Sequence, residues 1–225
     1  MREKCFYCGV QAAVLGDGRI KCSGCGRRYS PVKIRRRFRL AEAFCHNRSA
    51  RAASAECATS LVSAQQAYRD FRRLIIPLLE SDYEAHREAV TEYDEYLYLD
   101  ANKRRDRRHI FDAHNFLTFQ YGEKVYTLMM PSLERYKESF LSDGLEEVYY
   151  REFSRYLSFH RVARLRSRQN TIVRFWRFFE ELMPRYKGVR RENFVDYLKE
   201  AEFKFNYPMP ERIEILRTLI LEETA

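Results

Sequence analysis

The spacing of hydrophobic residues predicts two helical regions, one on either side of a stretch of strands. In residues 32–79, apolar positions recur at helical intervals in three segments, of which the second is short and alanine-rich and the third ends near Pro77. Asn47 or Ser49 can cap the second segment, and Ser60 can cap the third. A short helix, a tight turn and a longer helix are typical of a helix-turn-helix.

The middle of the chain is rich in Tyr, Phe and Val, which favour β-strands. We expect strands at residues 93–99, 109–120, 124–130 and 147–151, a further short one at 156–160, and a helix over 132–141. Three more helices are expected from Asn170 onward: a strongly apolar one that reaches Met183, and two over residues 193–205 and 211–222. This order of elements indicates an α/β domain over residues 80–225.

Four cysteines near the N-terminus form two Cys-x-x-Cys pairs that thirteen residues separate: Cys5 with Cys8, and Cys22 with Cys25. Thiolates at this spacing can surround one zinc ion tetrahedrally. Residues 1–31 are too few to be stabilised by burial alone, so a bound metal would supply much of their folding free energy. The sequence therefore predicts a zinc ribbon with a structural zinc ion. The other two cysteines are expected to be packed thiols.

Charge is concentrated at one end of the chain. The 225 residues include 41 Lys and Arg against 32 Asp and Glu. Residues 1–39 hold eleven basic and two acidic side chains, which accounts for the net charge of +9, because the other 186 residues are balanced at 30 against 30. A neutral body with a strongly basic N-terminal region indicates a polyanionic partner, most simply double-stranded DNA. The alternative is a basic surface that serves only solubility.

The candidate DNA contacts come from the basic run after the cysteines and from the start of the third predicted helix. Arginines suit phosphates, and exposed polar side chains at the start of a recognition helix suit base edges. The candidates are Arg35, Arg36, Arg37, Arg39, Ser60, Val62, Ser63, Gln65, Gln66 and Arg69.

Several classes of protein are disfavoured. No apolar run approaches the ~20 residues of a transmembrane helix, so we expect no membrane contact. No apolar stretch follows the N-terminus as in a secretory signal. We therefore expect a cytoplasmic, nucleoid-associated protein whose cysteines are thiols or metal ligands rather than disulfides. Neither a Walker A sequence nor Gly-x-Gly-x-x-Gly occurs, so nothing supports nucleotide-driven chemistry.

A series of motifs extends over nearly the whole chain. After the cysteine pairs and the predicted helix-turn-helix come Glu92-Tyr-Asp-Glu95, Gly122-Glu-Lys-Val-Tyr-Thr127, Asn170-Thr-Ile-Val-Arg-Phe-Trp176, Tyr186-Lys-Gly-Val189, Tyr197-Leu-Lys-Glu200 and Phe203-Lys-Phe-Asn206. In this order they resemble bacterial insertion-sequence transposases with an N-terminal zinc ribbon. The resemblance implies an α/β fold: a zinc ribbon (1–31), a helix-turn-helix region (32–79) and a ribonuclease-H-like mixed sheet flanked by helices (80–225).

The resemblance also implies a catalytic site. Such enzymes cleave and join DNA phosphodiesters with two divalent ions, Mg²⁺ or Mn²⁺, held by acidic residues. Asp94 matches the first of these residues. The second falls on Glu152, or on Arg151 if the register slips by one. The third falls on Val173, which cannot bind a metal, so Asn170 is left as a weak oxygen ligand.

Two functions therefore stay open. One is a transposase, active or catalytically impaired, that binds the ends of its element. The other is a non-catalytic DNA-binding protein derived from such an enzyme. In both cases we expect double-stranded DNA as a partner and a homo-oligomer as the functional form.

Overall fold

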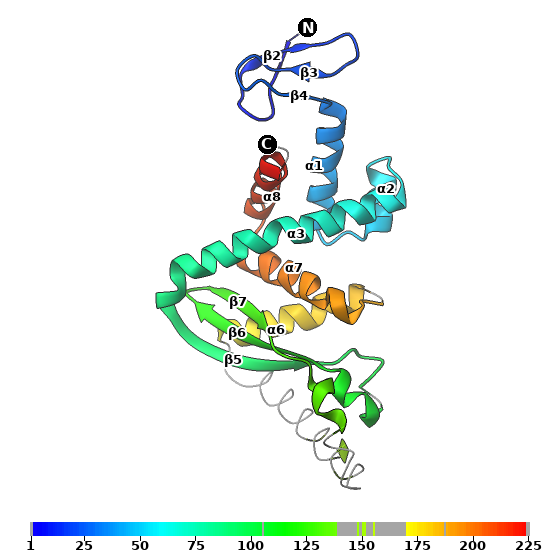
Figure 1. Ribbon diagram of the computed structural model, residues 1–225, viewed down its shortest axis with the longest axis vertical. Coiled ribbons are helices and arrows are strands. Elements are labelled where there is room, and N and C mark those ends of the chain that lie inside the picture. The colour runs from blue at the N-terminus through cyan, green and yellow to red at the C-terminus, as the bar shows by residue number, and fades with distance from the viewer. Residues whose placement is uncertain are drawn as a thin grey trace. The chain divides into compact units, whose positions relative to one another are not determined.

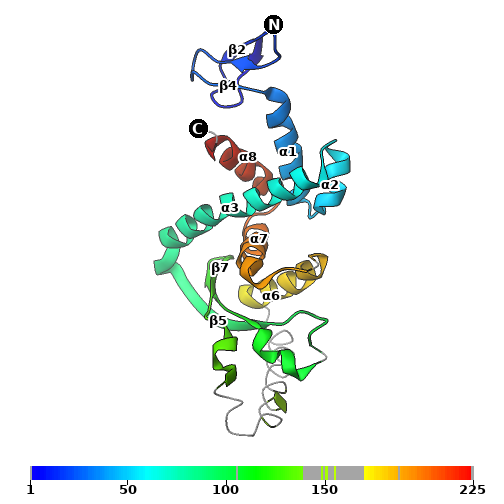
Figure 2. The same ribbon diagram turned by 45° about the vertical axis from the view of Figure 1, so that its right-hand side comes forward.

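The computed structural model describes residues 2–104, 106–138, 148, 150, 151, 155, 170–186 and 188–223. The chain forms two compact units: the first comprises Met1–Pro77 and Tyr207–Ala225, and the second comprises Leu78–Asn206 (Figures 1 and 2). Helices and antiparallel sheets occur together, so the protein has a mixed α/β fold. None of the described helices combines the length and the apolar composition that a bilayer span requires.

A small antiparallel sheet begins the first unit. Its four strands pair in the order β1 (Arg2–Lys4), β2 (Gln11–Val14), β3 (Ile20–Lys21) and β4 (Arg28–Tyr29). Because side chains alternate along a strand, Ala12 and Ile20 are buried on one face beside the cysteines, whereas Ala13 and Lys21 are exposed on the other. The sheet therefore has a core on one side only.

Three helices follow: α1 (Pro31–Cys45), α2 (Ala50–Glu56) and α3 (Leu61–His86). The Oγ of Ser49 accepts a hydrogen bond from the backbone N–H of Ala52 (3.2 Å), and the Oγ of Ser60 accepts one from that of Ser63 (3.0 Å). These bonds confirm the predicted cap of α3 and select Ser49 as the cap of α2. Ala58, in the turn between the two helices, has a φ of 48°.

The core of these helices is aromatic. The ring of Phe44 in α1 meets Tyr68 and Phe71 of α3 edge to face, with centroids 5.2 and 5.7 Å apart. Phe44 and Phe71 are fully buried, as is Ala53 of α2. A helix as short as α2 is marginal by itself, so the burial of Ala53 and the contact of α2 with α1 stabilise it.

The predicted end of α3 near Pro77 is wrong, because the helix continues to His86. A proline within a helix removes one backbone hydrogen bond and costs about 3 kcal/mol. Ile75 and Leu79, both fully buried, flank Pro77 by two residues on each side. Their burial offsets the cost and carries the helix past the proline.

The last helix, α8 (Glu211–Glu223), belongs to the first unit and packs against α1. Arg37 of α1 pairs with Glu223, and Arg217 of α8 pairs with Glu42 (3.4 Å). The helix matches the one expected over residues 211–222. The sequence groups it with residues 80–225, whereas its contacts in the structure are with the N-terminal helices.

The second unit is built on a three-stranded antiparallel sheet in the order β5 (Val90–Tyr98), β6 (His114–Tyr121) and β7 (Lys124–Met129). Gly122, with a φ of +56°, makes the tight turn between β6 and β7. The helices α6 (Thr171–Leu182) and α7 (Phe194–Asn206) pack against the sheet. Trp176 and Phe179 of α6 are fully buried with Phe116 of β6. The predicted helix after Asn170 is thereby confirmed as a core helix.

Two predicted strands differ from the structure. The strand expected over 109–120 begins at His114, because a 3₁₀ helix, Arg107–Asp112, precedes it. The strand expected over 147–151 is wrong, because the described residues Val148, Tyr150 and Arg151 are helical. Tyr150 is buried against Phe111, so its aromatic character reflects packing rather than a strand. The strand expected at 156–160 lies outside the described residues.

The helix expected over 132–141 begins as a 3₁₀ turn, Leu133–Tyr136, and is helical at 137 and 138. Its remaining residues lie outside the described part. Shorter 3₁₀ helices complete the second unit: Arg87–Ala89, Met183–Arg185 and Arg191–Asn193.

Side chains of α7 hydrogen-bond to the outer edge of β7. The amide of Asn206 accepts from the backbone N–H of Val125 (2.9 Å) and donates to its carbonyl (2.7 Å). At Thr127, Glu202 accepts from the backbone N–H (2.8 Å) and Lys199 donates to the carbonyl (2.7 Å). These side chains occupy the positions that a neighbouring strand would otherwise fill.

Two buried ion pairs lie within α7, and the first of them makes this contact. Lys199 and Glu202 are 2.9 Å apart, and Lys204 bonds Glu200, which also accepts a hydrogen bond from Tyr186. Burial raises the pKa of Glu202, and Lys199 opposes that rise. The motifs Tyr197–Glu200 and Phe203–Asn206 thus serve the packing of α7 on the sheet.

Acidification from pH 6.5 towards pH 4 is expected to destabilise the second unit through His114. Its ring stacks on Phe194 at 3.6 Å, and burial, together with Arg191 and Lys103, lowers its pKa to about 4 against the opposing effect of Asp112. The unfolded chain binds this proton near pH 6.5, whereas the folded chain binds it only near pH 4. The free energy of unfolding therefore falls across that window, by up to about 3 kcal/mol.

Chemical denaturation at pH 7 and pH 4.5 measures this effect. The matched variant is His114→Phe, which keeps a ring against Phe194 but cannot titrate. It should lose this part of the pH dependence. The same pH dependence in both proteins would contradict the assignment to His114.

Candidate functional site

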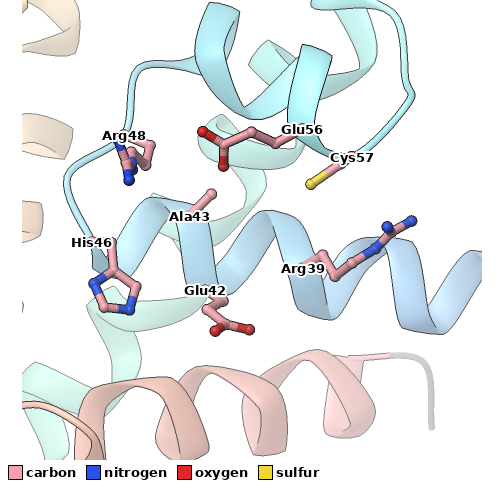
Figure 3. Close-up of a pocket in the computed structure, with 7 residues that line it drawn as sticks. All are labelled: Arg39, Glu42, Ala43, His46, Arg48, Glu56 and Cys57. Atoms are coloured by element: carbon pink, nitrogen blue, oxygen red, sulfur yellow. The ribbon is translucent and has the colours of Figure 1, made fainter.

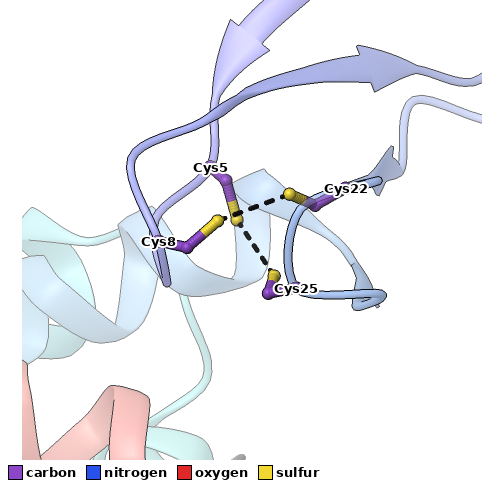
Figure 4. A group of neighbouring side chains, drawn as sticks. All are labelled: Cys5, Cys8, Cys22 and Cys25. Carbon is purple, nitrogen blue, oxygen red and sulfur yellow. Dashed lines mark hydrogen bonds between the residues drawn. The ribbon is translucent and has the colours of Figure 1, made fainter.

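Two tight turns bring the N-terminal cysteines together (Figure 4). In the first, the backbone N–H of Cys5 donates to the carbonyl of Val10 (2.9 Å), and in the second that of Cys22 donates to the carbonyl of Arg27 (2.9 Å). Gly9 and Gly26 follow the second cysteine of each pair with φ of 73° and 75°, a conformation that favours glycine.

The four Sγ atoms all lie within 4.8 Å of one another. Those of Cys5 and Cys25 are 3.7 Å apart, and those of Cys8 and Cys22 are 3.5 Å apart. A tetrahedral zinc ion with Zn–S bonds of ~2.3 Å requires sulfur atoms about 3.8 Å apart. The predicted clustering is confirmed, and its geometry and its soft donors fit one zinc ion.

The surroundings of the thiols favour their charged forms at two positions. Burial alone would raise the pKa of Cys5, but hydrogen bonds from the Tyr29 hydroxyl and from backbone N–H groups lower it to about 6. Backbone N–H groups of Cys25 and Gly24 lower the pKa of Cys22 despite its desolvation. A thiolate is the form that binds metal. Four such ligands would complete the coordination of zinc, which is typical of a structural site rather than a catalytic one.

The remaining cysteines, Cys45 and Cys57, are buried outside this cluster. The thiol of Cys45 lies 3.7 Å from the backbone carbonyl of Arg212 in α8. Both are packed thiols, as the sequence predicts.

The candidate contacts at the start of α3 lie on its surface. Val62 is 71% exposed, and Ser63, Gln65, Gln66 and Arg69 are also exposed. In proteins that read DNA, an exposed apolar side chain among polar ones can contact a thymine methyl.

Some of these polar groups are already hydrogen-bonded within the helix. Gln66 donates to Asp70 (2.8 Å) and accepts from Arg69 (2.5 Å). Ser60 is occupied in capping α3, with its hydroxyl 2.9 Å from that of Ser63. Among the candidates of α3, Gln65 forms no side-chain hydrogen bond with another described residue, and Val62 has no polar side-chain atom.

The arginines of α1 divide into two groups. Arg35 pairs with Glu3 of the ribbon (2.7 Å), and Arg37 pairs with Glu223. Arg36 and Arg39 form no ion pair with any described residue. The unpaired arginines are the better candidates for phosphate, because no internal salt bridge has to break.

Three further arginines of the first unit are candidates for phosphate contacts. Arg48, Arg51 and Arg73 are exposed and form no ion pair within the described part of the chain. They lie beyond residue 39, in the part of the sequence where basic and acidic residues balance. Their shared position in the helices of the first unit is therefore what identifies them as candidate cations.

Arg39 and Arg48 also line an open pocket of about 360 Å³ between α1 and α2 (Figure 3). His46 lines the same pocket. The carboxylates of Glu42 and Glu56 balance these cations, so the pocket has little net charge and is a weaker anion site than the surface around it.

The two units differ sharply in charge. The first holds 18 basic and 9 acidic side chains, and the second holds 23 of each. The whole excess of +9 therefore belongs to the unit that contains the cysteine cluster and the three N-terminal helices.

The residues matched to a catalytic site are positioned in different ways. Asp94 is in β5, opposite Thr118 of β6, and alternation along the strand directs Glu95 to the other face. Asn170 caps α6: its Oδ1 accepts from the N–H of Val173 (2.9 Å), and its amide donates to Glu92 (2.8 Å). Both ends of the Asn170 amide are thus already hydrogen-bonded.

Of the other matched positions, those that the structure describes, Val173 and Arg151, offer no further ligand. Val173 is buried, Arg151 is helical and Glu152 lies outside the described residues. Another carboxylate of α6, Glu180, already accepts hydrogen bonds from Tyr96 (2.7 Å) and Arg104 (2.9 Å). In the described part of the chain, the four cysteines form the one group of three or more metal-binding side chains within reach of a single ion.

No protein-family model, curated protein or solved structure matches the chain.

Proposed function

We propose that the protein binds double-stranded DNA through its first unit, with a structural zinc ion holding the ribbon. The observation that carries this proposal is the charge of that unit: 18 basic against 9 acidic side chains, beside a second unit that is neutral. Solubility alone does not require all of the net charge to lie on one unit. A long polyanion does require a concentrated positive surface.

The arrangement of the helices supports the same proposal. A short helix, a turn and a longer helix follow one another, the longer helix packs on α1 through Tyr68 and Phe44, and its start is exposed. In this proposal Val62 and Gln65 reach base edges, and the unpaired Arg36 and Arg39 contact phosphates.

We expect the double variant Arg36→Gln/Arg39→Gln to bind every DNA sequence more weakly, because phosphate contacts carry no sequence information. Two lost phosphate contacts should reduce the slope of log K against log salt concentration by about 1.8. Fluorescence anisotropy with a labelled duplex at several salt concentrations measures both effects.

The matched control is Arg185→Gln/Arg190→Gln, which removes two exposed arginines from the neutral second unit. It should leave affinity and slope unchanged. Equal losses in the two double variants would show a non-specific charge effect, and a wild-type protein that does not bind duplex DNA would refute the proposed function.

The resemblance to transposases supports a second candidate function, metal-dependent cleavage of DNA by a ribonuclease-H-like second unit in a homo-oligomer. One observation favours it: Asp94 and Glu92 share a face of β5, and Glu92 bonds Asn170 at the start of α6. Oxygen-bearing side chains from two elements are therefore close to one another. Mg²⁺ or Mn²⁺ would supply the activated nucleophile.

We expect this activity to appear as Mg²⁺- or Mn²⁺-dependent nicking of a duplex that Asp94→Ala abolishes. Loss of a carboxylate ligand should reduce the rate by orders of magnitude. Glu95→Gln is the matched control, because its side chain points to the opposite face of the sheet. Nicking that persists in Asp94→Ala, or absent in the wild type with either metal, would refute the cleavage function and leave DNA binding unaffected.

A further inference from the structure

One face of the ribbon sheet carries a row of cations. Arg2, Ala13, Lys21 and Arg28 lie directly opposite one another on β1 to β4, and Lys4 lies opposite Gln11 in the adjoining row. All of these residues are exposed. The opposite face of the same sheet is the one that covers the cysteines. We call the exposed side the ribbon face.

This arrangement is unfavourable for the ribbon by itself. Like charges directly opposite on neighbouring strands, such as Lys21 and Arg28, destabilise a sheet by up to about 1 kcal/mol. Asp17 relieves only part of this repulsion, through its ion pair with Arg28 (2.7 Å). Arg2 and Lys21 form no ion pair with any other described residue.

Ala13 leaves a shallow space between two of these cations. A pocket of about 300 Å³ is lined by Arg2, Gln11, Ala13, Lys21 and Ser23. No carboxylate and no aromatic ring lines it. It presents a guanidinium, an ammonium, an amide and a hydroxyl, all of which can donate hydrogen bonds to phosphate oxygens.

The composition of the pocket favours duplex over single-stranded nucleic acid. Proteins that bind single strands stack the bases on exposed aromatic side chains, and the lining of this pocket has none. Arg2 and Lys21 are two strands apart, which is about 10 Å between backbones. That separation lies between the widths of the minor and major grooves, about 6 and 12 Å, so both side chains can reach phosphates that flank one groove.

We infer that the ribbon face binds the phosphate backbone of double-stranded DNA, with Arg2 and Lys21 on either side of Ala13 as its main contacts. The inference rests on the proposed function and extends it, because it gives the ribbon a direct role in binding besides its structural one. Contacts of this kind strengthen binding to all sequences alike.

Ala13→Glu tests the inference without altering the core, because Ala13 is exposed. A carboxylate there would stand between Arg2 and Lys21 and repel phosphate. We expect affinity for a labelled duplex of arbitrary sequence to fall on the order of tenfold at low salt. Ala13→Gln has the same size without the charge and should bind like the wild type. Zinc content, measured in parallel on the full-length variants, should equal that of the wild type.

A second variant, Arg2→Gln/Lys21→Gln, should lower the salt slope by about 1.8, equally for all sequences. Suppose that the wild type binds duplex DNA, that Ala13→Glu binds it with the same affinity, and that the double variant has the same salt slope. This result would overturn the inference and leave the proposed function standing. Tighter binding of a single-stranded oligonucleotide than of the duplex would also overturn it. A wild-type protein that fails to bind duplex DNA would instead remove the proposed function itself.

Discussion

Replacement of Cys22 by serine should release the metal and unfold the ribbon. Cys22 is 1% exposed, and its thiol lies 3.5 Å from that of Cys8, so its loss removes one of four ligands at the centre of the small core. Zinc ribbons of this size owe most of their stability to the metal, with apparent binding free energies of about 10 kcal/mol or more. Elemental analysis should show zinc content fall from one ion per chain to nearly none.

The same variant should bind DNA much more weakly, because unfolding the ribbon disperses its cations. Cys57→Ala is the matched control: it removes a buried cysteine outside the cluster and should keep the zinc ion. A wild-type protein purified without zinc, or a Cys22→Ser protein that retains it, would contradict the metal assignment.

Replacement of Lys204 by methionine is expected to lower the free energy of unfolding by about 3–5 kcal/mol. Lys204 and its partner Glu200 have side chains that are each 1% exposed. Methionine would fill much of the space of Lys204 but would remove the cation that pairs with the buried carboxylate of Glu200. Urea denaturation measures the loss.

Two controls separate the buried charge from a simple packing defect. In Lys204→Met/Glu200→Gln, the neutral amide can still accept the hydrogen bond of Tyr186, so at least half of the lost stability should return. Arg174→Met breaks an exposed pair with Glu123 and should cost less than about 1 kcal/mol. A double variant as unstable as Lys204→Met alone would indicate packing rather than charge.

Local chemistry in the sequence was enough to predict much of the first unit. Cysteine spacing predicted the cluster, and Ser49 and Ser60 marked the starts of two helices, because a side-chain oxygen satisfies the first backbone N–H groups wherever the helix lies. The end of α3 was missed because Pro77 is a strong local signal. Burial of Ile75 and Leu79 overrides the helix-ending effect of Pro77, and this burial exists only in the folded chain.

In the second unit, the structure depends more on long-range packing than on local sequence signals. β5 to β7 were predicted from their aromatic and branched residues, but the same signal misled around Tyr150, which is helical and packed on Phe111. The charged residues of α7 resemble those of a solvent-facing helix. Their burial depends on partners such as Thr127, about 75 residues away in sequence, which a local pattern does not reveal.

For the candidate site, the sequence located the cluster of four cysteines and the basic character of the first unit. It did not separate Arg36 and Arg39 from Arg35 and Arg37, because the acidic partners Glu3 and Glu223 come from distant segments. The ribbon face was hidden for the same reason: Arg2 and Lys21 become neighbours of Ala13 only when the strands pair.

The contacts of α7 with β7 also limit how copies of this protein can associate. A sheet with a bare outer strand can recruit the same strand from another molecule and grow into an aggregate. On β7, the amide of Asn206 and the ion pair of Glu202 and Lys199 already occupy the backbone groups of Val125 and Thr127 that such recruitment would need. Addition of a strand from a second copy at Val125 and Thr127 of β7 is therefore blocked.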